Sequence, residues 1–144
     1  TKCFSASMEP RIVTSNKVAG RNGFEYYIGE ETPFTGTVID YHENGNKKLE
    51  RFYQNGLRYG TERTWYDNGD KCSEVPWVDG KRHGHETVWL EANHSQKSCE
   101  RGWKNGKYHG ANIHFNHDGT VRYQCTYIDG KEQTPLRKLA KFFF

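Results

Sequence analysis

The chain has 144 residues, of which 33% are hydrophobic and 15% aromatic, and its formal net charge is +3 at pH 7. The length suits one domain, but a mean hydropathy of -1.03 leaves too little aliphatic material for the core of a two-layer sandwich of this size. Charges of both signs are interleaved, which argues against nucleic-acid binding, and no stretch has the pattern of a membrane span or a signal peptide.

The beginning of the chain shows little pattern. We expect residues 1–19 to be irregular, apart from a short strand at 11–14. Asn22-Gly23 then predicts a turn, and the aromatic stretch 24–28 predicts a strand. We expect this strand to pair with the first repeat and so to cap the sheet.

From residue 36 onward the chain repeats one unit four times, at spacings of 24, 24 and 26 residues. Each unit has a glycine, an aromatic residue five positions later, and then a β-prone segment that ends in another aromatic residue. Such a period predicts an array of repeats that contact only their neighbours. We therefore expect an all-β fold, a single twisted antiparallel meander of β-hairpins within residues 20–133. The units span about 36–59, 60–83, 84–109 and 110–133.

The register of each hairpin follows from its turn. If Asn44-Gly45 forms a two-residue loop, then Gly36 lies opposite Tyr53, and Tyr41 lies opposite Lys48. In every copy this rule sets a glycine against a large aromatic side chain, whose ring can cover the bare backbone. The remaining pairs are Gly60 with Trp77, Trp65 with Cys72, Gly84 with Trp103, and Gly110 with Tyr127.

The third repeat has two extra residues. With Asn93-His94 as its loop, each strand gains one residue, and Thr87 still faces Glu100. Register and facing are then preserved, whereas a single inserted residue would turn one strand over.

The tail at 134–144 departs from the repeat. Leu136, Leu139 and Phe143 lie at helical steps. We expect a short helix or extended segment that covers the last edge strand, and the alternative is a basic, aromatic foot on a membrane.

The recurring unit resembles the MORN repeat, and more closely the MORN variant of bacterial YwqK-family antitoxins. The residues that carry the resemblance are Arg21-Asn22-Gly23, Tyr26-Tyr27, Pro33-Phe34-Thr35-Gly36, Tyr41-His42-Glu43-Asn44-Gly45, Lys81-Arg82-His83-Gly84 and Lys107-Tyr108-His109-Gly110. The resemblance implies a bacterial protein whose meander makes protein contacts, sometimes at a membrane, and in this variant neutralises a partner toxin. The fourth copy departs from the pattern at Val121 and Thr134, as suits a terminal capping repeat.

Histidines and cysteines are the candidates for a metal site. His83 and His109 fall next to a turn glycine at the same place in their repeats, so a role in packing the turn is favoured over metal binding. We expect no metal and no cofactor. Equivalent strands of successive repeats should lie about 9.5 Å apart, too far for a ladder of disulfides. Free thiols are favoured, although bridging stays open for Cys3, Cys72, Cys99 and Cys125.

Carboxylates form a second regular row, at Glu50, Glu74 and Glu100, with Gln124 in the fourth copy. Their expected spacing on an open sheet favours cross-strand ion pairs over an acid/base pair. Because no nucleophile triad or phosphate loop accompanies them, we expect the protein not to be an enzyme.

Two aromatic rows are the strongest functional signal. Tyr41, Trp65, Trp89 and Phe115 should lie on one face, and Tyr53, Trp77, Trp103 and Tyr127 on the other. We predict that the first row contacts another protein, with Arg63 and Glu86 tuning specificity. The alternative that both rows only hold the sheet together stays open.

The predicted partner is a protein, with a toxin as the specific case and an antitoxin or immunity role for this chain. The rival interpretation is a module that binds anionic lipid or cell-wall glycan. The chain should be a monomer or an edge-paired dimer, because a meander leaves two edges. Its localisation stays open between the cytoplasm, which is slightly favoured, and an exported or envelope-associated form.

Overall fold

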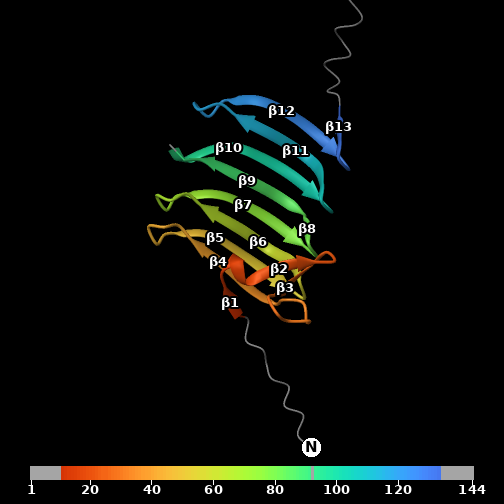
Figure 1. Ribbon diagram of the computed structural model, residues 1–144. Coiled ribbons are helices and arrows are strands. Elements are labelled where there is room, and N and C mark those ends of the chain that lie inside the picture. The colour runs from red at the N-terminus through yellow and green to blue at the C-terminus, as the bar shows by residue number, and fades with distance from the viewer. Residues whose placement is uncertain (1–10, 92, 134–144) are drawn as a thin grey trace, which may run out of the picture.

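The computed structural model describes residues 11–91 and 93–133. Most of them lie in strands of one 11-stranded sheet, whose order follows the chain from β4 onward, with β8 paired to β7 beside this path (Figure 1). Its strands are β1 (Arg11–Val13), β4 (Gly36–Tyr41), β5 (Lys47–Gln54), β6 (Leu57–Trp65), β7 (Lys71–Val78), β8 (Lys81–Arg82), β9 (Gly84–Leu90), β10 (Asn93–Lys104), β11 (Lys107–Phe115), β12 (Val121–Ile128) and β13 (Lys131–Gln133). The expected all-β meander of repeated hairpins is confirmed.

The register predicted from the glycine–aromatic pairs is also confirmed. Gly36 pairs with Tyr53, and the equivalent glycine and aromatic residue pair in each of the other three repeats. Each of these glycines therefore lies directly opposite a large aromatic residue in the strand ladder.

The hairpin loops within the repeats differ from the prediction. Gly45 N donates to His42 O at 2.9 Å and His42 N donates to Asn46 O at 2.8 Å, which encloses a three-residue loop. Gly45 has φ of 88°, the left-handed conformation that closes such loops. Tyr41 therefore pairs with Lys47 instead of Lys48, and a bulge restores the predicted register one residue further on. Trp65 likewise pairs with Lys71 instead of Cys72.

The two-residue turns lie at the opposite ends of the strands, between one repeat and the next. Asn55 and Gly56 have φ of 49° and 78°, which identifies a type I′ turn. The glycine of each such turn also donates its N–H to a carbonyl of the preceding repeat, as Gly80 does to Arg58 O at 2.9 Å. Successive repeats are thereby joined by hydrogen bonds beyond the sheet ladder.

The third repeat accommodates its extra residues in one strand. Asn93 belongs to β10 and pairs with Leu90, so the predicted loop at Asn93-His94 is wrong. The register shift between Asn93 and Lys97 places the additional residues in a bulge of β10, whereas the shift before Cys99 is the one that the other repeats also have. Thr87 still pairs with Glu100 as predicted.

The N-terminal cap also differs from the prediction. The predicted short strand at 11–14 is β1, and it pairs with β4 in parallel, which makes this edge of the sheet mixed. The strand expected to cap the first repeat, β3 (Phe24–Tyr27), instead pairs with β2 (Val18–Arg21) in a separate hairpin. Residues 11–19, expected to be irregular, thus hold β1, the 3-10 turn η1 (Ser15–Lys17) and the start of β2.

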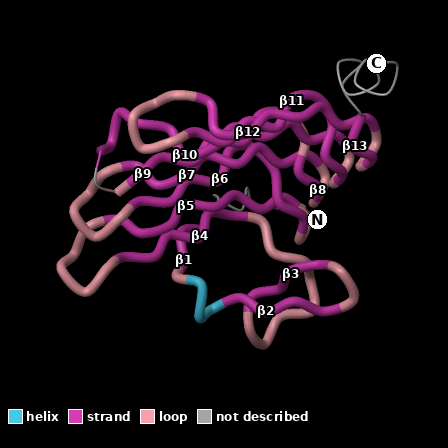
Figure 2. Tube along the Cα trace, turned by 90° about the horizontal axis from the view of Figure 1, so that it is seen from above, coloured by secondary structure: helices cyan, strands magenta, loops and turns pink. Residues whose placement is uncertain are grey.

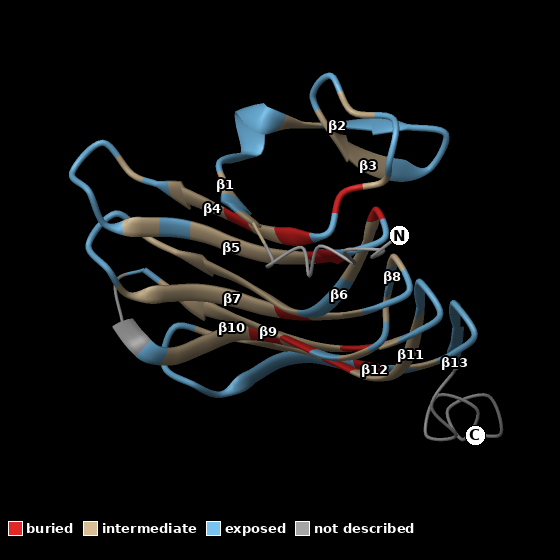
Figure 3. Cartoon of the chain, turned by 90° about the horizontal axis from the view of Figure 1, so that it is seen from below, coloured by how far each residue is buried: buried red, intermediate tan, exposed pale blue. Residues whose placement is uncertain are grey.

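The hairpin packs against one face of the sheet at its β4–β5 end (Figures 2 and 3). Phe34, Val38 and Tyr53 are buried there and contact Val18 and Tyr27 of the hairpin. Burying each side chain of this size stabilises the fold by about 1.5–3 kcal/mol. The expectations for the tail at 134–144 and for Cys3 lie outside the described residues.

Candidate functional site

The alternation of side chains along the strands divides the sheet into two faces. The hairpin face is the one against which β2 and β3 pack, and it holds Tyr53, Trp77, Trp103 and Tyr127. The open face is the other, and it holds the predicted contact row. Tyr41 is 58% exposed, whereas Trp65, Trp89 and Phe115 are partly buried.

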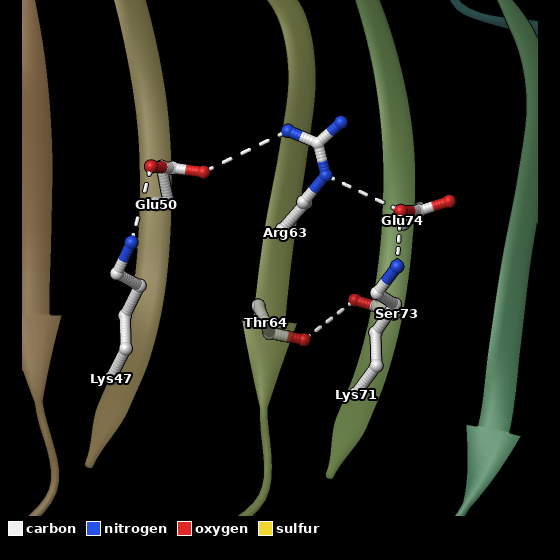
Figure 4. Close-up of polar contacts among 7 residues, drawn as sticks. All are labelled: Lys47, Glu50, Arg63, Thr64, Lys71, Ser73 and Glu74. Carbon is white, nitrogen blue, oxygen red and sulfur yellow. Dashed lines mark hydrogen bonds and ion pairs between the residues drawn. The ribbon is translucent and has the colours of Figure 1, made fainter. Parts of the chain in front are cut away.

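A ladder of ion pairs runs across the open face (Figure 4). Arg63 lies between two carboxylates, 3.7 Å from Glu50 and 3.3 Å from Glu74. Lys47 approaches Glu50 at 3.3 Å, and Lys71 approaches Glu74 at 2.7 Å. The cross-strand ion pairs expected from the sequence are confirmed, and because the groups are part-exposed each contributes at most about 1 kcal/mol.

Arg63 was predicted to tune specificity. In the structure its guanidinium is engaged by the carboxylates on either side. Lys71 and then Arg63 hold the pKa of the Glu74 carboxyl below its usual value, since both cations favour the ionised form. Arg63 therefore connects repeats across the face and presents little unpaired charge.

Each tryptophan of the open face is held by the preceding repeat. The Lys47 ammonium lies 5.3 Å from the Trp65 ring centre, and the Lys71 ammonium lies 5.5 Å from that of Trp89. The backbone at these positions is held as well, because Tyr66 Oη donates to Trp89 O at 2.8 Å. His42 Nε2 makes the equivalent bond to Trp65 O. The two indoles are thus held in place before any partner binds.

Glu86 does not join the predicted contact row. It is only 5% exposed and lies on the hairpin face, because it stands three positions before Trp89 on a regular strand and side chains an odd number of positions apart point to opposite faces. Trp103 Nε1 donates to its carboxylate at 2.6 Å, and Arg101 approaches it at 3.4 Å. The prediction that Glu86 contacts a partner together with the row is corrected by this placement.

On the hairpin face, side chains that were not predicted from the sequence lie next to the predicted aromatic residues. Together they form what we call the aromatic stack: Arg58, Trp77, Arg82, Trp103, Tyr108 and Tyr127. Arg58 lies 4.7 Å from the Trp77 ring centre, and Arg82 lies 5.6 Å from Trp77 and 4.8 Å from Trp103. Tyr108 follows at 4.2 Å from Trp103 and 5.2 Å from Tyr127. The signal was present, because the two-residue turns pair Trp77 with Arg82 and Trp103 with Tyr108.

A cleft of about 440 Å³ lies between the β2–β3 hairpin and this stack. Glu25 comes from the hairpin, and Arg58, Trp77 and Lys81 come from the sheet. Trp77 Nε1 is buried and has no acceptor among the residues described.

The histidines next to the turns act as predicted. His83 Nδ1 accepts the backbone N–H of Asn105 at 3.3 Å, and His109 Nδ1 accepts that of Asp129 at 3.3 Å. Within residues 11–91 and 93–133, no group of histidines, cysteines and carboxylates has the arrangement of a metal site. Cys72, Cys99 and Cys125 have free thiols. No helix in the described part of the chain is long and apolar enough to span a membrane.

Comparison with known families identifies one unit of the array. Residues 34–55 match the MORN repeat variant, a stretch that contains β4, the loop and β5. Comparison with curated proteins gave no match. Repeats of this class generally bind proteins or membranes and are not typically enzymatic.

Proposed function

We propose that the protein is a binding module that contacts another protein through the open face. The contact row is Tyr41, Trp65, Trp89 and Phe115, and Arg63 lies beside it on the same face. The observation that carries the proposal is that Trp65 and Trp89 are part-exposed and already fixed by the preceding repeat. Partly exposed, immobilised aromatic side chains are typical anchors of protein interfaces, because little entropy is lost on binding.

Within residues 11–91 and 93–133, no hairpin covers the open face, because β2 and β3 pack against the hairpin face. Its ion pairs are satisfied internally, so a partner does not have to neutralise an isolated charge. This favours a protein over an anionic membrane, which would be attracted by a surplus of unpaired cations.

We further propose that the partner is a toxic protein that this chain neutralises, as an antitoxin or immunity protein. The support is the resemblance of the repeated unit to YwqK-family antitoxins. A row of anchors along the sheet suits such a role, because it can cover an extended surface of a partner.

The test is capture of partners from an extract of the source organism by the purified chain, followed by mass spectrometry and titration. We expect one protein to be retained in stoichiometric amount. Trp65→Ala and Trp89→Ala should each weaken binding about tenfold or more. Tyr41→Ala serves as a third variant that should leave the fold intact, because the ring is mostly exposed.

Tyr123→Ala is the matched control, since Tyr123 is an exposed aromatic residue of the hairpin face. Unchanged affinity in all three row variants would contradict the proposal. So would an empty capture together with binding to anionic vesicles that disappears with salt. Binding to cell-wall glycan alone would likewise replace the protein partner.

A further inference from the structure

The aromatic stack on the hairpin face contains one arginine without an acidic partner. Arg82 lies between Trp77 and Trp103, against the rings of both. Among the described residues no carboxylate lies within ion-pair distance of its guanidinium.

The glutamates beside the stack are already engaged. Glu62 pairs with Arg51 at 2.5 Å and with Arg58 at 3.5 Å. Glu86 pairs with Arg101 and accepts the indole N–H of Trp103. Of the two arginines in the stack, Arg58 and Arg82, only Arg82 therefore has no carboxylate partner among the described residues.

The surroundings of Arg82 suit recognition of a carboxylate. Cation–π contacts use the flat faces of the guanidinium, whereas its N–H donors lie in the plane and remain available. A guanidinium held between two rings is also oriented before binding, so a bidentate pair with a carboxylate costs little further ordering. The side chain is partly buried, and partial removal from water strengthens such a pair.

We propose that the hairpin face binds an extended acidic segment of a protein partner, with an aspartate or glutamate carboxylate on Arg82. Residues next to that carboxylate pack along the edges of Trp77 and Trp103. This surface is on the opposite side from the contact row and does not depend on it.

The test measures fluorescence anisotropy of a labelled peptide of alternating glutamate and leucine on the full chain at low salt. The matched peptide has glutamine in place of each glutamate. We expect the glutamate peptide to bind about tenfold or more tightly than the glutamine peptide, and to weaken as salt is added. Arg82→Gln should remove the difference between the two peptides, and Arg82→Lys should retain part of it, because lysine keeps the charge and loses the planar fork.

Arg58→Gln is the matched control. Arg58 also lies against Trp77, but its guanidinium is engaged by Glu62, so this variant should change the affinity less than threefold, roughly. Trp65→Ala, on the open face, should leave peptide binding unchanged, which separates this surface from the contact row. Equal affinity for both peptides, no binding of either at millimolar concentration, or full binding by a folded Arg82→Gln variant would overturn the proposal.

Discussion

The second and third repeats have a glutamate and a tryptophan at equivalent positions, yet the two pairs are connected differently. In the third repeat, Trp103 Nε1 donates to Glu86 at 2.6 Å. In the second repeat, Arg51 Nε donates to Glu62 at 2.5 Å, and Trp77 Nε1 has no acceptor within the described residues. The same residue types at the same positions thus give a satisfied indole in one repeat and an orphaned one in the next.

The difference arises from the position of the arginine. Two residues before the tryptophan, the third repeat has Arg101 and the second has Val75. Arg101 shares a strand with Trp103, and both side chains approach Glu86. The second repeat has no arginine at the position of Arg101, and Glu62 is bound by Arg51 and Arg58 of the preceding repeat instead. The partners of this glutamate therefore differ with the arginines that each repeat places around it.

The largest effect is expected on removing the shared acceptor of the third repeat. Glu86→Ala leaves Arg101 and the Trp103 N–H without a partner in a buried setting, and should lower the free energy of unfolding by about 3 kcal/mol. Glu62→Ala should cost less, because the Glu62 side chain is 13% exposed and that of Glu86 only 7%. Urea denaturation of both variants gives the comparison, and a greater loss for Glu62→Ala would contradict it.

The next effect separates the two indoles directly. Trp103→Phe removes a hydrogen bond to a charged group, whereas Trp77→Phe removes a donor that has no acceptor. With similar losses of ring area, Trp103→Phe should be more destabilising than Trp77→Phe by about 2 kcal/mol. Thermal unfolding monitored by circular dichroism measures this, and equal losses would show that the bond to Glu86 adds nothing.

A smaller effect tests whether Arg51 and the Trp77 N–H compete for the carboxylate of Glu62. Arg51→Leu leaves the Glu62 carboxylate with the more distant Arg58 as its one remaining partner among the described residues, so that it can accept the Trp77 N–H. The loss in the free energy of unfolding should therefore be about 1 kcal/mol smaller with Trp77 present than in a Trp77→Phe background. A double-mutant cycle in urea gives this coupling, and additive losses would mean that the two groups do not compete.

The smallest effect concerns the open face, whose ion pairs are part-exposed. Because Lys71 and Arg63 lower the pKa of Glu74 from 4.5, its stabilising contribution is complete above that value and is lost as the pH falls through the lowered pKa. Glu74→Gln should remove that part of the acid-side slope of stability, at a cost near neutral pH of about 0.5 kcal/mol. Glu43→Gln, in an exposed loop, is the control and should leave the slope unchanged. An unaltered slope in Glu74→Gln would contradict the prediction.

Much of the meander could be predicted because its register depends on local geometry. The position of each glycine opposite an aromatic residue follows from where a hairpin turns and how many residues flank it. The loop type did not follow, because an Asn-Gly pair suits two kinds of turn. In Asn55-Gly56 both residues have positive φ, whereas in Asn44-Gly45 only the glycine does. Which turn forms depends on the twist of the flanking strands, and the two residues of an Asn-Gly pair carry no information about that twist.

Features that depend on contacts between distant segments were missed. β1 pairs with β4 in parallel, and a parallel pair has no connecting turn that a local pattern could reveal. The binding partners of Glu62 and Glu86 differ although their positions in the repeat agree, so periodicity alone could not identify them. Placing Glu86 on the hairpin face needed only the two-residue period of a strand, and that signal was available.

The bond from each turn glycine to the preceding repeat has a consequence for how such molecules change in length. Gly80 N–H meets Arg58 O, Gly106 N–H meets Arg82 O, and Gly130 N–H meets Tyr108 O, so every unit brings the donor that fastens it to the one before. Removal or duplication of residues 60–83 would recreate the same junctions. A gene encoding this chain can therefore gain or lose a unit by in-frame recombination, and each event moves the ends of the molecule apart or together by about 9.5 Å, two strand spacings.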